Sequence, residues 1–422
     1  MISLIEALNY RCLRYVRQPL DAFHVLVGPN GSGKTSFLDA VGLLHDLLAE
    51  GIDQAISLRS ADFRDLTWRR AGTSLELAIE AVIPHSMREL LEDPGFDTVR
   101  YELALRLESP ADQVEIVAEQ GFLKTAQQQG TPQRTLFPMP ELPPPTIVTP
   151  HSVRESRRLF SKTPGGNDNY YAEAHPKQGR WRPAFKLGPR KSTLANLPED
   201  ETNFPVSTWL KRLIETGVER ITLNSAEMRR ASPPGQGTGF RADGSNLPWV
   251  VAELERSSPN RLREWVEHLR TALPDLVSVT TTERPEDRHR YLRLIYRDNL
   301  EVPSWLVSDG TLRLLALTLP AYLENLRGIY LIEEPENGIH PLAVDAVYQS
   351  LSSVYDAQVL LATHSPVILG DAEPAQVLCF AKTPDGATDI VSGAAHPGLA
   401  GWRGEVDLGT LFASGVLGEP TS

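Results

Sequence analysis

Two kinds of hydrophobic pattern divide the chain. In its first third, apolar and polar residues alternate with a period of two, which is typical of half-buried strands. Three segments carry this pattern and are predicted as antiparallel strands: 74–83, 99–108 and 114–123. Residues 2–28 predict one or two further strands, the last at 24–28, and residues 36–50 have the apolar spacing of a helix.

The rest of the chain changes to helical spacing and then to a mixture. Residues 206–217 and 246–272 predict helices, residues 276–297 a pair of strands, and residues 305–395 alternating helices and strands. After the last of the predicted antiparallel strands, residues 124–150 are rich in proline and glutamine and predict an irregular or disordered loop. Strands mixed with helices in this order predict an α/β fold.

Composition places the chain among soluble globular proteins, with 41% apolar and 23% charged residues. The net charge of −12 argues against a surface that binds nucleic acid indiscriminately. Two distant cysteines, Cys12 and Cys379, predict a reducing compartment without disulfides. The N-terminus lacks a signal-peptide pattern, and no apolar run is long enough to span a bilayer. We therefore expect a cytoplasmic protein without membrane contact.

One stretch runs against the overall negative charge. From Arg154 to Lys191 there are ten Lys or Arg against three Asp or Glu, with Tyr170, Tyr171 and Trp181 interleaved. Cations combined with aromatic residues favour contact with DNA. A solvated basic loop, or an intramolecular partner for the acidic remainder of the chain, explains the same residues, so both interpretations stay open.

The sequence GPNGSGKT at 28–35 is a phosphate-binding loop. It fits the pattern G-x-x-x-x-G-K-[ST] between a predicted strand and a predicted helix, which is the context this motif needs. Loop amides and the helix N-terminus would surround the phosphates of ATP, with Lys34 on the β- and γ-phosphates and Thr35 on Mg²⁺. The predicted nucleotide-binding residues are Gly28, Pro29, Asn30, Gly31, Ser32, Gly33, Lys34, Thr35 and Ser36.

Two adjacent carboxylates end the apolar strand GIYLIEE at 328–334. Ending a buried strand in two acids is costly unless a cation or a reaction needs them. A P-loop nucleotide needs a second strand that carries an acid to the metal and places a base near the γ-phosphate. Glu333 is therefore predicted to hold Mg²⁺ through water, and Glu334 to polarise the attacking water.

Two later motifs add candidate residues. Ser308 and Gly310 begin an apolar helix in WLVSDGTLRLLALTL, and a serine N-cap with free helix amides forms an anion site. His364 ends a buried strand in VLLATHSPVIL, where a histidine is either structural or close to a ligand.

The order of P-loop, Ser-x-Gly before a helix, Glu-ended strand and strand-ending histidine resembles the ABC-type ATPases. The phrases VGPNGSGKTSFLDA, FRADGSNLPWVVAEL, SDGTLRLLAL, IEEPENGIHP and LLATHSPVIL are similar to those of RecF-like and OLD-like bacterial ATPases, the AAA-21 and AAA-15 group. The resemblance implies that Ser308 and Gly310 cap the γ-phosphate of a nucleotide held by a second subunit, in a head-to-tail homodimer around ATP. It implies that His364 is a switch residue at the γ-phosphate, so that Lys34, Glu334 and His364 form the catalytic set.

The chain departs from the family pattern in places. Asp309 and Thr311 replace the usual residues of the signature, and Glu333 stands where most relatives have aspartate. Residues 54–68 are expected to contain the Q-loop, and Tyr10 either approaches the adenine or packs in the core.

The resemblance also implies a domain organisation. We expect an ABC-type ATPase head with a mixed central sheet and an antiparallel β subdomain, plus an inserted, mostly helical or irregular subdomain. The predicted boundaries are 1–123 for the N-terminal lobe, 124–300 for the insert and 301–422 for the C-terminal lobe. OLD-like proteins usually carry a C-terminal TOPRIM nuclease, and the 58 residues after His364 are too few for one. A separate effector chain, a nuclease or a toxin, is therefore expected.

The predicted function is an ATPase that dimerises around ATP and couples hydrolysis to DNA-related work, in repair or in defence against phage and plasmids. The alternative is an ATP-dependent scaffold that controls a partner protein without contacting DNA. A transport ATPase subunit fits less well because of the 274 residues between Lys34 and Ser308. A kinase or phosphotransferase would not need the signature or the switch histidine.

Overall fold

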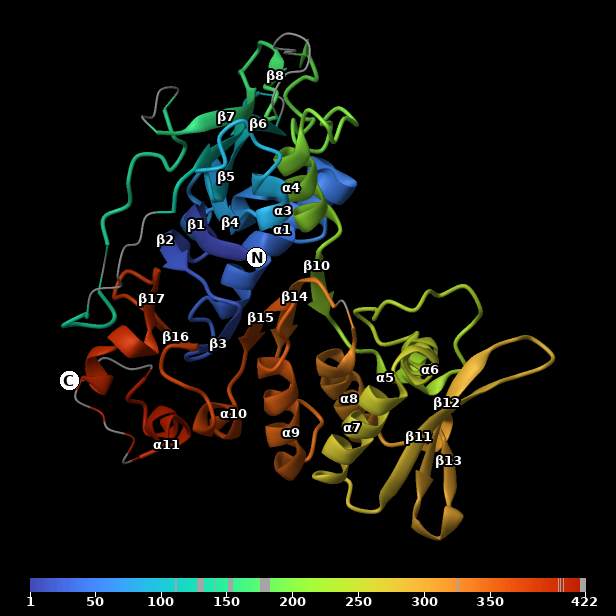
Figure 1. Cartoon of the computed structure of the whole chain (residues 1–422). Coiled ribbons are helices and arrows are strands. Elements are labelled where there is room, and N and C mark those ends of the chain that lie inside the picture. Colours follow the sequence, from blue (N-terminus) through green and yellow to red (C-terminus); the bar gives the residue numbers. More distant parts are fainter. Residues whose placement is uncertain are drawn as a thin grey trace.

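The structure is a computed structural model that describes the chain except for residues 111, 127–132, 140, 151–154, 175–182, 325, 401, 403, 405 and 418–422. Its described strands form sheets of eight, six and three strands. The eight-stranded sheet lies at one end of the molecule, the six-stranded sheet at its centre, and the three-stranded sheet projects to one side (Figure 1). The predicted α/β fold, with a mixed central sheet and an antiparallel β subdomain, is confirmed.

The eight-stranded sheet is antiparallel, in the order β2-β1-β4-β5-β6-β7-β8-β9. Its strands are β1 (Ile2–Tyr10), β2 (Leu13–Pro19), β4 (Ser74–Val82), β5 (Thr98–Glu108), β6 (Gln113–Lys124), β7 (Arg157–Lys162), β8 (Asp168–Tyr170) and β9 (Ala184–Phe185). The three strands predicted from period-two alternation are present as β4, β5 and β6. Strands β7 to β9 come from the predicted insert and extend this sheet, because the backbone groups of β6 need partners on its second side.

The six-stranded sheet has the order β10-β14-β15-β3-β16-β17, and only its last pair is antiparallel. Its strands are β10 (Val218–Ile221), β14 (Gly328–Glu333), β15 (Ala357–Ala362), β3 (Phe23–Val27), β16 (Val377–Lys382) and β17 (Thr388–Ser392). Since the carboxyl ends of parallel strands meet at one edge, the residues after β3, β14 and β15 come together there. The P-loop follows β3, Glu333 ends β14 with Glu334 directly after it, and His364 follows β15.

Helices cover both faces of the central sheet. The α-helices of the described chain are α1 (Lys34–Glu50), α2 (Ile52–Ser57), α3 (His85–Arg88), α4 (Pro205–Glu215), α5 (Ser225–Arg229), α6 (Leu247–Ser257), α7 (Pro259–Arg270), α8 (Asp309–Thr318), α9 (Pro341–Ser352), α10 (Pro366–Gly370) and α11 (Leu408–Ala413). The helical pattern predicted over 246–272 is two helices, since Pro259 lacks an amide hydrogen and begins α7.

The side chains of β15 separate two hydrophobic cores. Leu360 and Ala362 face a core shared by α1, α4 and the eight-stranded sheet, and Val359 and Leu361 face a core with helices α6 to α10. Helix α1 lies between the two large sheets (Figure 1). The P-loop is thus fixed by a strand and a helix that are both buried.

The three-stranded sheet is antiparallel and consists of β11 (Leu276–Glu283), β12 (Arg290–Tyr296) and β13 (Glu301–Pro303). Its first two strands are the pair predicted at 276–297. The loop predicted at 124–150 contains no helix or strand beyond the end of β6 among its described residues. The boundaries at 123 and 300 remain predictions.

Candidate functional site

The glycine-rich loop runs from the end of β3 into α1, which begins at Lys34. Gly28 has φ +148°, and a Cβ there would lie 2.2 Å from the carbonyl oxygen of Phe380. Gly33 has φ +110°, and its Cβ would lie 2.2 Å from the Oγ1 of Thr388. Glycine is needed at both positions, so the neighbouring strands β16 and β17 determine the shape of the loop.

The Lys34 ammonium folds back over this loop. Its Nζ donates to the carbonyl oxygens of Gly28 at 2.7 Å and Pro29 at 3.2 Å. Burial lowers the pKa of Lys34 to about 8, against the opposing effect of the Glu334 and Glu333 carboxylates. The lysine and both glutamates therefore lie within electrostatic reach of one another.

Thr35 and Glu333 meet directly. The Thr35 hydroxyl donates to Glu333 Oε2 at 2.5 Å, which connects the first turn of α1 to the end of β14. Hydroxyl and carboxylate oxygens are ligands that Mg²⁺ accepts, with water and phosphate oxygens completing its octahedron. No group of three or more His, Cys, Asp or Glu that could hold a metal occurs in the described part of the chain. The donor pair fits a Mg²⁺ ion that is bound largely through a nucleotide.

Glu334 sits in a strained backbone conformation. Its φ is +48°, which is uncommon for a residue with a Cβ and costs free energy that the surroundings must supply. Its amide donates to the carbonyl oxygen of Ala362 at 2.7 Å, and its carboxylate accepts from Asn337 Nδ2 at 2.5 Å. Glu334 is exposed, and the chain leaves the extended strand conformation at this residue.

His364 is positioned by a carboxylate that the sequence analysis did not single out. Glu336 Oε1 accepts from the amide of His364 at 3.0 Å and from the Thr363 hydroxyl at 2.7 Å. Burial and then the Lys34 ammonium lower the pKa of His364, against the raising effect of Glu334 and Glu336. The lowered pKa favours the neutral imidazole.

The Ser-x-Gly segment lies elsewhere. Ser308 is the N-cap of α8, and its Oγ accepts from the amide of Thr311 at 3.2 Å. A Cβ at Gly310 would lie 2.5 Å from the carbonyl oxygen of Gly338, in the turn that follows Glu334. Arg229 holds the segment from α5 by donating to the carbonyl oxygen of Val307 at 3.1 Å and pairing with Asp309.

The structure thus brings together some predicted residues and not others. Lys34, Thr35, Glu333, Glu334 and His364 converge at one sheet edge. Among the described contacts, none joins Ser308 or Gly310 to the P-loop of the same chain.

The remaining loop residues differ in exposure. Pro29, Asn30 and Gly31 are exposed, whereas the buried Ser32 Oγ has no hydrogen-bond partner among the described residues. Ser36 accepts from the Cys12 thiol at 3.3 Å.

Lys382 is a second cation at the loop that sequence reasoning missed. A Cβ on Gly31 would lie 3.1 Å from the Lys382 Nζ. This residue ends β16, the strand next to β3. No local motif marks it, because only the pairing of the two strands brings it to the P-loop.

Tyr10 takes the packing role rather than an adenine contact. It is fully buried, and its hydroxyl donates to Asp39 of α1 at 2.6 Å. Asp39 also pairs with Arg59 at 2.8 Å, with Arg220 at 2.9 Å and with Arg11 at 3.2 Å. Arg59 belongs to the region 54–68, part of which lines an open surface pocket of about 600 Å³ that Ser36 also borders.

The comparisons identify the family. Residues 23–118 and 141–370 match the AAA_21 family, described as "AAA domain, putative AbiEii toxin, Type IV TA system". The match covers more than half of the chain, so the protein belongs to this family of P-loop ATPase domains. No curated protein matches the chain in sequence.

Two solved structures share the fold of the whole head. An SMC head bound to the C-terminal winged-helix domain of ScpA is 16% identical, with a TM-score of 0.51, over 92% of this chain and 97% of that one. An SMC head with an extended coiled coil, bound to the C-terminal domain of ScpA derived from Pyrococcus furiosus, is 14% identical, with a TM-score of 0.50, over 92% and 95%. The ABC-type head that the motifs implied is confirmed. None of the described helices is both long and apolar enough to cross a membrane.

Proposed function

We propose that this protein binds and hydrolyses ATP with Mg²⁺ at the edge where β3, β14 and β15 end. The supporting observation is that Lys34, Thr35, Glu333, Glu334 and His364 reach one place from three separate strands. The loop amides and Lys34 bind the phosphates, and Thr35 and Glu333 hold the metal. Bound Mg²⁺ supplies charge neutralisation at the β- and γ-phosphates.

The hydrolytic step needs a group that accepts hydrogen bonds from water. The Glu334 carboxylate polarises the attacking water, and its strained backbone aims it at the nucleotide. His364 donates a hydrogen bond to the γ-phosphate, and its lowered pKa favours the uncharged imidazole in this role. Glu336 acts through His364, since it holds the backbone of that residue.

The position of Ser308 and Gly310 supports a dimer. They lie in the α8 N-terminus, apart from the P-loop of their own chain, and a helix N-terminus with a serine cap suits a phosphate. When two chains associate head to tail, each nucleotide is bound by the P-loop of one chain and by the Ser308 and Gly310 segment of the other. ATP then favours the closed dimer because its contacts to both chains exist only there.

The test uses two substitutions with matched controls. Glu334→Gln should lower ATP turnover at least about a hundredfold while ATP binding persists and dimers accumulate. Ser308→Arg should prevent ATP-dependent dimers, measured by light scattering, without loss of ATP binding to the monomer. Glu255→Gln and Ser257→Arg, both exposed on α6, control for charge and bulk. Full turnover by a monomeric Ser308→Arg protein contradicts the composite site.

The output of the ATPase cycle is DNA-related work in repair or defence, with a separate effector chain. The support is the basic segment 154–191, of which 154 and 175–182 lie outside the described residues, including Trp181. Within it, Lys186 and Lys191 are exposed and available for a phosphate backbone.

The alternative, a scaffold that controls a partner protein without DNA, gains support from the same segment. Lys162 is buried and pairs with Asp168 at 2.5 Å, and Arg157 pairs with Glu92 at 2.8 Å. Tyr170 is buried as well, with its hydroxyl donating to Thr193. These groups are bound within the chain.

ATP turnover with and without linear double-stranded DNA separates the two outputs. DNA stimulation that fades with salt supports the DNA-coupled cycle, and the pair Lys186→Glu and Lys191→Glu should remove it. Arg256→Glu, at an exposed position of α6, should leave it unchanged. Turnover that ignores DNA at every salt concentration supports the scaffold.

A further inference from the structure

The segment between β6 and β7 connects the two large sheets. We name its residues 133–139 and 141–149 the strap. Figure 1 shows this teal segment running beside the molecule from the eight-stranded sheet to β17. It is anchored at both ends, and each anchor is built on a buried carboxylate.

The first anchor joins the strap to β17. Arg134 pairs with both carboxylate oxygens of Asp389 at 2.7 and 2.8 Å, and the Met139 amide donates to Asp389 Oδ2 at 2.7 Å. The Phe137 ring is buried and packs edge-on against His396 at a centroid distance of 5.0 Å. Charge, backbone and apolar contacts all hold this end.

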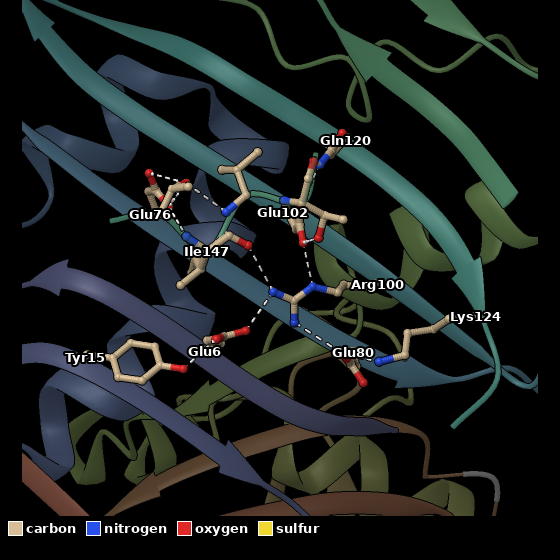
Figure 2. A network of polar contacts seen from close by, with 12 residues as sticks. Glu6, Tyr15, Glu76, Glu80, Arg100, Glu102, Gln120, Lys124 and Ile147 are labelled. Atoms are coloured by element: carbon tan, nitrogen blue, oxygen red, sulfur yellow. Dashed lines mark hydrogen bonds and ion pairs between the residues drawn. The ribbon is translucent and has the colours of Figure 1, made fainter. Parts of the chain in front are cut away.

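The second anchor lies on the outer face of the eight-stranded sheet (Figure 2). Glu76 accepts from the Ile147 amide at 2.6 Å and from the Thr146 hydroxyl at 2.8 Å. Glu102 accepts from the Thr149 amide at 2.7 Å and from its hydroxyl at 2.5 Å. The Ile147 side chain is buried in a small apolar cluster on this face.

The strap adds hydrogen-bond donors to a charged network on this face of the sheet. Arg100 is buried among three carboxylates, Glu102 at 2.6 Å, Glu6 at 2.7 Å and Glu80 at 3.2 Å, and Lys124 also pairs with Glu80. These three carboxylates outnumber the two cations that contact them, and the strap adds the Thr149 amide and hydroxyl as further donors to Glu102. Removing the strap would take from each oxygen of the buried Glu102 one of its hydrogen bonds, leaving only Arg100 on Oε1 and Gln120 on Oε2, which is costly.

The first anchor lies next in sequence to a residue that contacts the P-loop. Asp389 follows Thr388, whose hydroxyl donates to the carbonyl oxygen of Ser32 at 2.8 Å. The Thr388 amide donates to the carbonyl oxygen of Cys12 at 2.9 Å. Thr388 is also the residue against which Gly33 packs too closely to carry a side chain. A displacement of Asp389 would therefore be transmitted to the phosphate-binding loop through Thr388, its neighbour in sequence.

We propose that the strap couples the nucleotide site to the outer face of the antiparallel sheet. Docked on both anchors, it holds β17 against the P-loop and preorganises the cradle for phosphate. Release of the strap lowers ATP affinity, and by reciprocity ATP binding tightens the strap. A partner that lifts the strap from the sheet face thereby controls the ATPase from a distance. This inference rests on the proposed nucleotide function.

The experiment releases the anchor that is remote from the nucleotide. Ile147→Asp places a fourth carboxylate among Glu76, Glu102 and Glu6, and should eject the strap from the sheet. Leu142→Asp is the control, since Leu142 is 91% exposed on the same strap. A fluorescent ATP analogue should bind about five- to tenfold more weakly to Ile147→Asp, within the usual range of coupling between sites. Ile147→Ala, which is milder for folding, should shift affinity in the same direction.

Hydrogen exchange without nucleotide gives a second readout. In Ile147→Asp, exchange should rise over 141–150 and also over 377–392 and 28–35. Faster exchange confined to 141–150, with unchanged affinity, overturns the coupling. If the wild type binds no ATP, the nucleotide function fails, and the exchange over 28–35 still decides whether strap and P-loop are coupled.

Discussion

The two large sheets place their carboxylates in opposite circumstances. On the antiparallel sheet, Glu102 is fully buried, and its oxygens accept from Arg100, Gln120 and Thr149. At the edge of the parallel sheet, Glu334 is exposed and accepts from Asn337 alone among the described contacts. The first acid is saturated within the chain, and the second has acceptor capacity to spare.

This difference separates structural from ligand-directed acids. A buried carboxylate must be neutralised and hydrogen-bonded for the chain to fold at all. A carboxylate at an open edge, next to Lys34 and Thr35, costs little in folding because water solvates it until a ligand arrives. Its strained φ of +48° is a further sign, since strain collects at functional sites.

The largest expected effect breaks the saturated side of this comparison. Arg100→Met leaves Glu6, Glu80 and Glu102 buried without their main cation and should destabilise the fold by about 3–5 kcal/mol. Arg106→Met, on the same strand but with a side chain 52% exposed, should cost under about 0.5 kcal/mol. Urea unfolding measures both. Equal losses from the two substitutions would show that the network does not stabilise the sheet.

A second experiment concerns a buried acid that is hydrogen-bonded chiefly to amides. Glu173 accepts from the amides of Val206 and Ser207 at the start of α4, and burial raises its pKa to about 7. The folded chain therefore keeps a proton that the unfolded chain releases above its ordinary pKa. The contribution of Glu173 to stability should be largest below about pH 4.5. It should decline by at most about 3 kcal/mol up to about pH 7 and stay constant above that pH.

Glu173→Gln tests this sign, because glutamine cannot ionise. The stability of Glu173→Gln relative to the wild type should therefore increase as pH rises from 4.5 to 7.5. A difference that stays constant with pH would mean that Glu173 has an ordinary pKa in the folded chain.

The unsaturated side is tested at the P-loop. Lys34→Ala removes the cation that donates to the loop and should weaken ATP binding about a hundredfold, which is ~2.7 kcal/mol. Its thermal stability should change little, because burial already disfavours the charged lysine. Calorimetric titration and thermal unfolding provide the two measurements. A large loss of stability with intact ATP binding would reverse the assignment of this edge.

The smallest effect is expected at Lys382. Its ammonium lies beside Gly31, and Lys382→Ala should weaken ATP binding about tenfold at low salt, ~1.4 kcal/mol, with recovery in Lys382→Arg. The effect should shrink as salt rises. Lys191→Ala, at an exposed lysine beside the antiparallel sheet, is the matched control. Identical ATP affinities in the two alanine variants would show that Lys382 does not contribute to phosphate binding.

Local pattern was enough for the elements and for the core of the site. Alternation predicted β4, β5 and β6, and the GPNGSGKT spacing predicted the loop and the start of α1. The strand-ending acids and histidine could be aligned with the P-loop because parallel strands bring their carboxyl ends to one edge. Such features depend on neighbours in sequence or on a general rule of sheet geometry.

Other features had no local signal. The strands β7 to β9 were expected as part of an irregular insert, because their pairing with β6 depends on a distant partner. No local signal showed that Glu336 holds His364, since this role depends on the His364 backbone. Tyr10 was left between two roles until Asp39 was seen to accept its hydroxyl hydrogen bond.

The sequence by itself determined the class of this protein: the P-loop, the paired acids and the order of motifs belong to an ABC-type head, and the chain is a member of the AAA_21 family. Only the tertiary structure decided which acids are saturated and which remain open. It alone brought Lys382 to the loop and tied the strap to β17 and the antiparallel sheet. The physical reason is that burial and neutralisation of charge depend on residues far apart in the chain, whereas backbone periodicity and loop motifs are written in consecutive ones.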